Sequence, residues 1–237
     1  MSQIPAWSFS RLSVFEQCPY RAKLQYLDKI PEPERELPPG KTEHANERGT
    51  RVHEAAEIFV QQDVELIPEL GKFRDEFTDL KTRFKEGKVS LEGEWGFTKD
   101  WEPTAWMSAD TWLRVKLDAL VWLSDDTALV IDYKTGKKYG NEIKHGEQCH
   151  LYQLATFFKY PQLQHITAEL WYLDQDDVTR FKYTREQGMR FFRNFNERGR
   201  AITDATSYPP KPNVFNCKWC PYAPHASGVC EYGVERR

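Results

Sequence analysis

The segment VKLDALVWLSDDTALVIDYKTGK, residues 115–137, decides the fold that we expect for this chain. Two runs rich in β-branched, aromatic and aliphatic residues, 111–123 and 127–134, have the composition of β-strands, and the polar SDDT between them indicates a turn. The segment therefore predicts a β-hairpin. Asp118 lies in the middle of its first strand, and Asp132 lies near the end of its second.

The length of the hairpin loop decides whether the two aspartates meet. Asp132 and Lys134 are two residues apart in one strand, so they project from the same face. A loop of three or five residues places Asp118 opposite Asp132 on that face, with Cβ atoms about 4.5–5.5 Å apart. A loop of two or four residues sends Asp132 to the other face. We therefore predict an odd-length loop.

Two carboxylates at that distance repel each other, and burying them unpaired is costly. A divalent cation resolves the conflict, since Mg²⁺ or Mn²⁺ prefers oxygen ligands and keeps waters, one of which can attack a phosphodiester. The ammonium group of Lys134 can orient that water or offset negative charge on the phosphate. The alternative interpretation of an isolated Asp-x-Lys is a salt-bridged pair on a half-exposed hairpin.

The segments around the hairpin carry helical and strand patterns in turn. A helix capped by Ser8 or Ser10 is interrupted by Pro19, and the proline-rich stretch 31–40 is a loop. Further helices are expected over about 46–62, 72–85, 146–160 and 185–203, and further strands over about 92–97, 165–174 and 177–184. We interpret residues 1–237 as one α/β domain with an N-terminal helical region and a cysteine-rich C-terminus.

The composition is that of an ordinary globular protein, with 40% hydrophobic and 29% charged residues among 237. No apolar stretch approaches the ~20 residues that span a bilayer, and the N-terminus MSQIPAWSFS has no signal-peptide pattern. We therefore expect a soluble, intracellular (cytoplasmic) protein without a membrane partner.

The net charge of −3 excludes a generally basic nucleic-acid binder, although local basic patches can still steer a polyanion. Five arginines gather in the last expected helix. Because Glu186 and Glu197 interleave with them, we interpret the group as a solvated face. Its members are Arg185, Arg190, Arg193, Arg198 and Arg200.

Five cysteines, an odd number without a secretory signal, make a disulfide framework improbable and point to metal binding instead. Cys149 is interpreted as a buried thiol without a ligand role. The other four are Cys18, Cys217, Cys220 and Cys230.

The hairpin motif resembles that of the PD-(D/E)XK nuclease superfamily, in particular its RecB-like exonuclease branch, which includes CRISPR-associated and AddB-type iron–sulfur nucleases. The family places an aspartate on one strand and Asp/Glu-x-Lys on the next, as Asp118 and Asp132-Tyr133-Lys134 do. Leu117 precedes Asp118, so the initial "PD" is not literal. The resemblance implies a restriction-endonuclease-like core, a central mixed sheet flanked by helices.

The resemblance extends to both sides of the hairpin and spans nearly the whole chain. The family carries a helical histidine ahead of the strands, matched by His53 in ERGTRVHEAAE, and a later Gln-x-x-x-Tyr helix, matched by Gln148 and Tyr152. It implies that His53, Asp118, Asp132 and the backbone carbonyl of Tyr133 hold the metal. It also implies that Gln148 and Tyr152 position DNA.

The same branch often carries four cysteines that ligate a [4Fe–4S] cluster, one near the N-terminus and three near the C-terminus. Cys18 in FEQCPYRAKLQYLDKI and Cys217 and Cys220 in NCKWCPY resemble those motifs, and Cys230 is the implied fourth ligand of a C-terminal metal clamp. The alternative is a zinc knuckle, because Cys217, Cys220, His225 and Cys230 have the spacing C-x2-C-x4-H-x4-C.

We therefore expect a Mg²⁺- or Mn²⁺-dependent deoxyribonuclease, an exonuclease acting on single-stranded DNA or DNA ends, with Lys134, Asp118 and Asp132 as its catalytic residues. Without an ATPase P-loop, any helicase is a separate chain, and replication or recombination proteins are possible partners. One alternative is a non-catalytic nucleic-acid-binding protein with a zinc knuckle and a degenerate nuclease core. Another is an adaptor protein in a recombination or replication complex.

Overall fold

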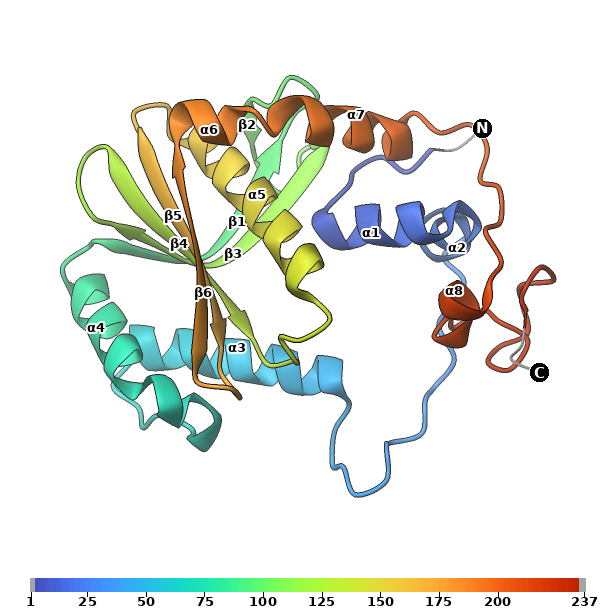
Figure 1. The fold of residues 1–237 in the computed structure, drawn as a ribbon, viewed down its shortest axis with the longest axis horizontal. Coiled ribbons are helices and arrows are strands. Elements are labelled where there is room, and N and C mark those ends of the chain that lie inside the picture. Colours follow the sequence, from blue (N-terminus) through green and yellow to red (C-terminus); the bar gives the residue numbers. More distant parts are fainter. Residues whose placement is uncertain (1–2, 235–237) are drawn as a thin grey trace.

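The computed structural model describes residues 3–234, and it is built around a six-stranded sheet with the order β2-β1-β3-β4-β5-β6 (Figure 1). β4 and β5 are parallel, whereas all other neighbours are antiparallel. The sheet is therefore mixed, as expected. The strands are β1 (Val89–Phe97), β2 (Pro103–Thr104), β3 (Leu113–Trp122), β4 (Thr127–Lys134), β5 (His165–Tyr172) and β6 (Asp177–Thr184).

Helices precede, connect and follow the strands. They are α1 (Phe9–Gln17), α2 (Pro19–Ala22), the π-helical η1 (Lys23–Leu27), α3 (Ala45–Gln61), the 3₁₀-helical η2 (Pro68–Phe73), α4 (Arg74–Lys85), α5 (Glu142–Lys159), α6 (Arg185–Met189), α7 (Phe192–Thr203) and α8 (Val214–Lys218). No helix within residues 3–234 is long and apolar enough to cross a membrane.

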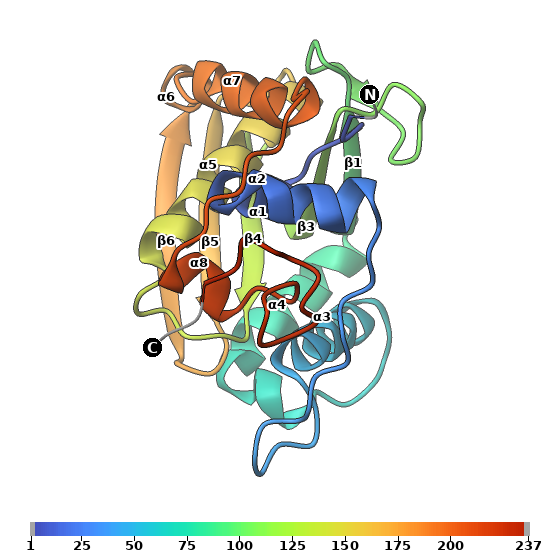
Figure 2. The same ribbon diagram turned by 90° about the vertical axis from the view of Figure 1, so that its right-hand side faces the viewer.

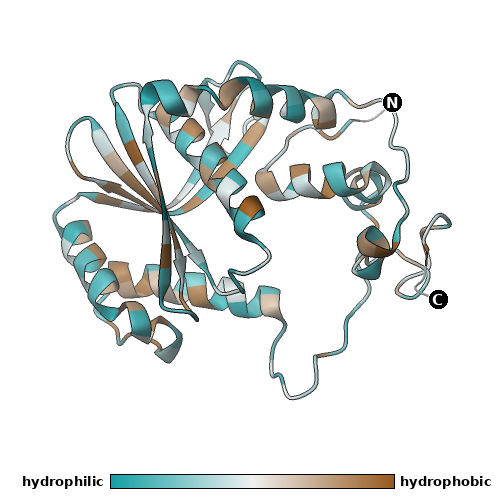
Figure 3. Ribbon diagram, viewed as in Figure 1, coloured by the Kyte–Doolittle hydropathy of each residue, from teal (hydrophilic) through white to brown (hydrophobic). Residues whose placement is uncertain are grey.

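The hydrophobic core has two parts. One joins α5 and α7 with the N-terminal segment and the strands, through residues such as Trp7, Leu154 and Phe195. The other joins α3 and α4 with the strands, through residues such as Val52 and Phe77. Hydrophobic residues accordingly lie along the strands, whereas the loop that follows η1 is mostly hydrophilic (Figure 3). Helices thus pack against a central sheet in two separate layers of contact.

The β3–β4 hairpin has the predicted odd register. Trp122 pairs with Ala128, the Leu123 N–H donates to the Thr127 carbonyl at 2.9 Å, and residues 124–126 close a three-residue loop. Continued along the strands, this register places Asp118 opposite Asp132. The parallel β4–β5 pair needs a crossover connection, which α5 supplies.

Two expected helices have different bounds. α5 begins at Glu142, earlier than expected, whereas the helix expected over 185–203 is divided into α6 and α7. The division follows from tight i→i+3 turns, in which Arg190 and Phe191 donate to Gln187 and Gly188. Phe191 then stacks on His150 of α5, with ring centroids 4.0 Å apart, so packing fixes the break.

The two ends of the described chain lie side by side. In Figure 2 the segment after α7 passes next to α2, and three contacts support this placement. The Asn216 amide donates to the Gln17 carbonyl at 2.9 Å, Tyr222 Oη donates to the Ile30 carbonyl at 2.8 Å, and Arg198 of α7 forms an ion pair with Glu16 of α1. Residues from the two ends can therefore contribute to one site.

Candidate active site

β3 and β4 stop pairing immediately before the two aspartates. The last antiparallel pair on this side is Ala119 with Ile131. One residue further, Asp118 Oδ2 accepts a hydrogen bond from the backbone N–H of Tyr133 at 2.6 Å. The carboxylate thus accepts a hydrogen bond that a backbone carbonyl accepts elsewhere in the ladder. Its side chain lies in the opening between β3 and β4.

α3 brings His53 to the same carboxylate. His53 Nδ1 lies 2.7 Å from Asp118 Oδ1, and the histidine ring packs edge-on against Tyr133. Val52, Ala56 and other apolar residues of α3 fix the helix against the sheet, which aims His53 at the strand opening. The family resemblance implies that His53 is a metal ligand, and the structure puts it in direct contact with Asp118.

The ionisation of this pair reflects its burial. Burial raises the pKa of Asp118, and the nearby charge of Asp132 raises it further, which outweighs the hydrogen bonds from His53 and Tyr133. Burial alone lowers the pKa of His53, but its hydrogen bond to Asp118 and the charges of Asp118 and Asp132 reverse the effect. The net pKa of His53 is therefore raised. Both groups therefore keep their protons to a higher pH than they would with unshifted pKa values.

Asp132 and Lys134 connect the strand end to α5. Lys134 Nζ lies 2.5 Å from Asp132 Oδ2 and donates to Gln148 Oε1 at 2.7 Å. Gln148 Nε2 in turn donates to Tyr152 Oη at 2.5 Å. The i,i+4 spacing of Gln148 and Tyr152 on α5 allows this last contact. Burial, followed by the charges of Asp132 and Asp118, raises the pKa of Tyr152, so its phenol stays neutral.

One open cavity of about 500 Å³ collects these groups. All seven residues that the sequence predicted for catalysis, metal binding and DNA positioning line it: His53, Asp118, Asp132, Tyr133, Lys134, Gln148 and Tyr152. Lys116 and Glu54 also line the cavity, although the sequence did not predict them as site residues. Lys116 precedes Asp118 by two residues, so strand alternation could have revealed it. No comparable pattern marks Glu54.

The cavity has the chemistry of a cation site. Asp132 Oδ2 is buried without a hydrogen-bond partner among the described residues, because its contact with Lys134 is an ion pair outside hydrogen-bond geometry. The carboxylate of Asp118 beside it is 11% exposed. Within residues 3–234 no three His, Cys, Asp or Glu side chains form an assembled ligand group. His53 and Asp118 instead hydrogen-bond each other. A buried oxygen lacking a donor, next to a second carboxylate, fits a divalent cation.

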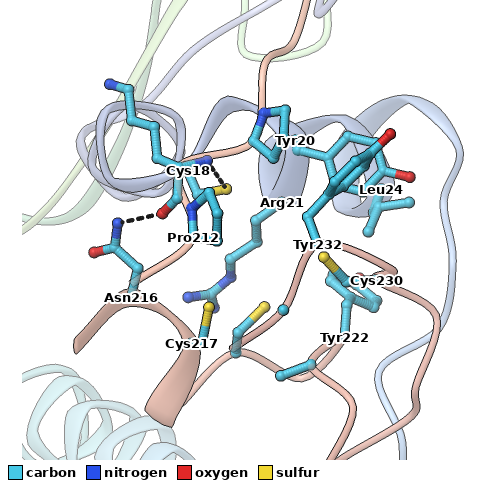
Figure 4. Close-up of a pocket in the computed structure, with 15 residues that line it drawn as sticks. Cys18, Tyr20, Arg21, Leu24, Pro212, Asn216, Cys217, Tyr222, Cys230 and Tyr232 are labelled. Carbon is cyan, nitrogen blue, oxygen red and sulfur yellow. Dashed lines mark hydrogen bonds between the residues drawn. The ribbon is translucent and has the colours of Figure 1, made fainter. Parts of the chain in front are cut away.

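A separate pocket at the joined chain ends gathers four cysteines. Cys18, Cys217, Cys220 and Cys230 all line it, together with Arg21 (Figure 4). Burial raises the pKa of the Cys230 thiol, and the neighbouring Cys220, Cys18 and Cys217 add to that effect. The four thiols thus line one pocket, without forming an assembled ligand group within residues 3–234.

His225, the alternative zinc ligand, and Cys149, the fifth cysteine, lie outside this pocket. His225 does not line this pocket, and its Nε2 lies 3.3 Å from the Lys218 carbonyl. Cys149 is buried in α5, where burial and the charge of Asp132 raise its pKa to about 12. Cys149 is a free thiol in the core, as the sequence predicted.

The family model of the PD-(D/E)XK nuclease superfamily matches residues 6–225, so the chain belongs to this superfamily. Its members are typically metal-dependent nucleases that act on nucleic acid and commonly use Mg²⁺ or Mn²⁺. The matched region contains every candidate active-site residue.

The crystal structure of SSO0001 is similar with a TM-score of 0.43 and 13% sequence identity, covering 99% of this chain and 90% of that one. No curated protein matches the chain.

Proposed function

We propose that this chain is a RecB-like, Mg²⁺- or Mn²⁺-dependent deoxyribonuclease that acts as an exonuclease on single-stranded DNA or DNA ends. The observation that carries the proposal is the single cavity in which Asp118, Asp132, Lys134 and His53 meet between β3, β4 and α3. DNA is its partner. A helicase, replication or recombination protein on a separate chain is consistent with this role.

Asp118, Asp132, His53 and the carbonyl of Tyr133 would hold the divalent cation, and Gln148 and Tyr152 would position DNA. When bound, the cation supplies Lewis acidity and an activated water for phosphodiester hydrolysis. This assignment uses all the cavity-lining residues that the sequence predicted.

Lys134 acts from a fixed position. A lysine ammonium has three N–H donors, of which one donates to Gln148 Oε1, while its positive charge pairs with Asp132. A remaining donor serves the substrate phosphate, where it offsets the charge that develops in the transition state. Because Tyr152 holds Gln148, and Gln148 holds Lys134, the ammonium needs little reorganisation during the reaction.

A cleavage assay on labelled single-stranded and duplex DNA tests this function. The wild type is expected to cleave with Mg²⁺ or Mn²⁺, and Asp132→Ala and Lys134→Ala are expected to lose activity at least about 100-fold. Asp125→Ala, on the exposed loop of the same hairpin, is the matched carboxylate control and should cleave normally. A wild type that cleaves neither substrate, or two active-site variants that cleave as well as Asp125→Ala, would favour a non-catalytic nucleic-acid-binding protein.

We further propose that Cys18, Cys217, Cys220 and Cys230 ligate a [4Fe–4S] cluster rather than Zn²⁺. Four thiolates are the usual ligand set of such a cluster, and these four line one pocket, whereas His225 does not. The cluster would join the chain ends, which are about 200 residues apart in sequence. By analogy with a disulfide, the stabilisation is about 5 kcal/mol.

Metal analysis of anaerobically purified variants separates the two ligand sets. With a cluster, Cys18→Ser loses iron and acid-labile sulfide, and His225→Ala retains them. With a zinc knuckle of Cys217, Cys220, His225 and Cys230, His225→Ala loses zinc and Cys18→Ser keeps it. Cys149→Ala is the cysteine control, because Cys149 lies in α5 away from this pocket.

A further inference from the structure

A groove of about 410 Å³ adjoins the active-site cavity, and the two share Lys116, Lys134, Gln148 and Tyr152. We call it the basic groove. It extends from these shared residues along β3 to the start of α1 and to the start of α5. Its other lining residues include Trp106, Arg114, Lys144 and His145.

The charge of the basic groove is opposite to that of the chain. Arg114, Lys116, Lys134 and Lys144 line it, and none of its described lining residues is an aspartate or glutamate, whereas the whole chain has a net charge of −3. Burial lowers the pKa of His145, and the positive charges of Lys134 and Lys144 lower it further against the opposing charges of Asp132 and Glu142. A polyanion therefore meets a local positive potential on an otherwise acidic protein.

The floor of the basic groove is a stretch of β3 that β4 does not cover. β4 pairs with β3 only at residues 119–122. At the other end of β3, Trp7 takes the position beside the strand, donating to the Trp112 carbonyl and accepting from the Arg114 N–H, both at 2.8 Å. Arg114 and Asp118 share one face of β3 and lie about 13 Å apart along it.

Trp106 lies next to Arg114, at the end of the basic groove that is far from Asp118. It is half-buried, so part of its ring faces solvent. Arg114 Nε donates to the Trp106 carbonyl at 3.0 Å, and the guanidinium lies 5.6 Å from the centroid of the indole ring. This pair holds an aromatic surface and a positive charge in fixed positions. Grooves that bind single strands combine such charges with aromatic rings on which bases stack.

We propose that the basic groove binds single-stranded DNA on one side of the scissile phosphate, with Arg114 and Lys144 contacting phosphates and Trp106 stacking on a base. The proposal rests on the proposed nuclease function and specifies how its substrate is bound. At the 3.4 Å spacing of a stacked strand, the ~13 Å from Asp118 to Arg114 correspond to at most about four nucleotides. A substrate must therefore extend beyond the cleaved bond to use the groove.

Equilibrium binding without divalent metal tests the groove separately from cleavage. The probe is fluorescein-labelled oligothymidylate of about 12 nucleotides, compared with the equivalent oligouridylate and a duplex of the same length. Lys144→Gln is the main variant, because Lys144 is exposed and its loss leaves the core intact. Lys159→Gln is the matched control, since it removes the same charge about 22 Å away at the other end of α5.

Lys144→Gln and Arg114→Gln should each reduce the slope of log affinity against log salt by about 0.7, the value for one phosphate contact on a single strand. Lys159→Gln should leave the slope unchanged. Trp106→Leu should weaken binding of the single strand by about 5- to 150-fold. It should leave duplex binding unchanged. Arg114→Lys keeps the charge and should preserve the salt slope even if the Trp106 contact is lost.

Salt slopes for Lys144→Gln and Arg114→Gln that match the wild type would overturn the proposal. So would equal weakening of duplex binding by Trp106→Leu, or tighter binding of oligouridylate than of oligothymidylate. If the wild type cleaves DNA while the groove variants bind normally, the groove assignment fails and the nuclease function stands. If the variants lose binding but the wild type cleaves nothing, the groove stands and the nuclease function fails.

Discussion

Asp118 Oδ2 accepts a hydrogen bond from the backbone N–H of Tyr133 at 2.6 Å, where β3 and β4 cease to pair. The side chain therefore accepts a hydrogen bond in the position of a backbone carbonyl of the ladder. This holds a carboxylate between two strands, facing His53 on one side and near Asp132 on the other. This hydrogen bond from β4 thus fixes the position of the Asp118 carboxylate in the candidate active site.

Stability without metal should fall as the pH rises. The pKa of Asp118 is raised from 3.8 and that of His53 from 6.5, so the folded state holds these protons more tightly than the unfolded chain. Their contribution is present below the unfolded pKa values and is lost as the pH rises through the folded ones. Thermal unfolding in EDTA should show Tm decreasing above pH 6.5, where His53 titrates.

Asp118→Asn is the control for this pH dependence, because it removes one titrating group and the charge that raises the pKa of the other. Its Tm should depend less on pH than that of the wild type. Excess Mn²⁺ should oppose the decrease in the wild type, since cations bind the deprotonated ligands. Identical pH profiles for wild type and Asp118→Asn in EDTA would contradict this explanation.

Tyr152→Phe should slow cleavage modestly. It removes only the hydroxyl that accepts from Gln148 Nε2 and leaves the aromatic packing intact. One neutral hydrogen bond is worth about 0.5–1.5 kcal/mol, which corresponds to a loss of about 2- to 12-fold in kcat/KM. Gln148→Ala should have a larger effect, because Lys134 then loses its own partner as well.

A double-mutant cycle shows whether these residues act as one unit. The combined loss in Gln148→Ala/Tyr152→Phe should be close to that of Gln148→Ala alone, since Tyr152 acts on Lys134 through Gln148. Losses that simply add would show that Tyr152 affects the reaction independently of Lys134.

Gly199→Ala should destabilise the fold. A Cβ at this position in α7 would lie 2.6 Å from the Trp7 ring and 2.7 Å from the Trp112 ring, closer than atoms can pack. Glycine to alanine within a helix otherwise stabilises by about 1 kcal/mol, but overpacking costs about 1–3 kcal/mol. Urea unfolding should show a lower midpoint. Gly71→Ala, whose Cβ meets no atom within 4 Å, should leave it nearly unchanged.

The sequence predicted much of the site because its geometry depends on local rules. Strand alternation places Asp132 beside Lys134, the odd loop places Asp118 opposite, and helical spacing joins Gln148 to Tyr152. Each of these follows from the periods of strands and helices. The mixed sheet flanked by helices, in contrast, was implied by the family resemblance and not by these local periods.

The parts that the sequence could not predict depend on tertiary contacts. The arginine group is a solvated face only in part. Arg190 and Arg193 form exposed ion pairs with Glu186 and Glu197, but Arg185 donates to four backbone carbonyls at and beyond the end of α5. The placement of Trp7 beside β3, which shapes the basic groove, is likewise invisible in any local pattern.

His53→Ala should raise the Mn²⁺ concentration needed for half-maximal cleavage by at least about 10-fold, because it removes a proposed ligand and the hydrogen-bond partner of Asp118. Titration of Mn²⁺ against initial rate measures this, and enough Mn²⁺ should restore part of the activity. His165→Ala, an exposed histidine at the start of β5, should behave as wild type. If His53→Ala lowers the maximal rate but leaves the Mn²⁺ requirement unchanged, His53 orients Asp118 and does not bind the metal.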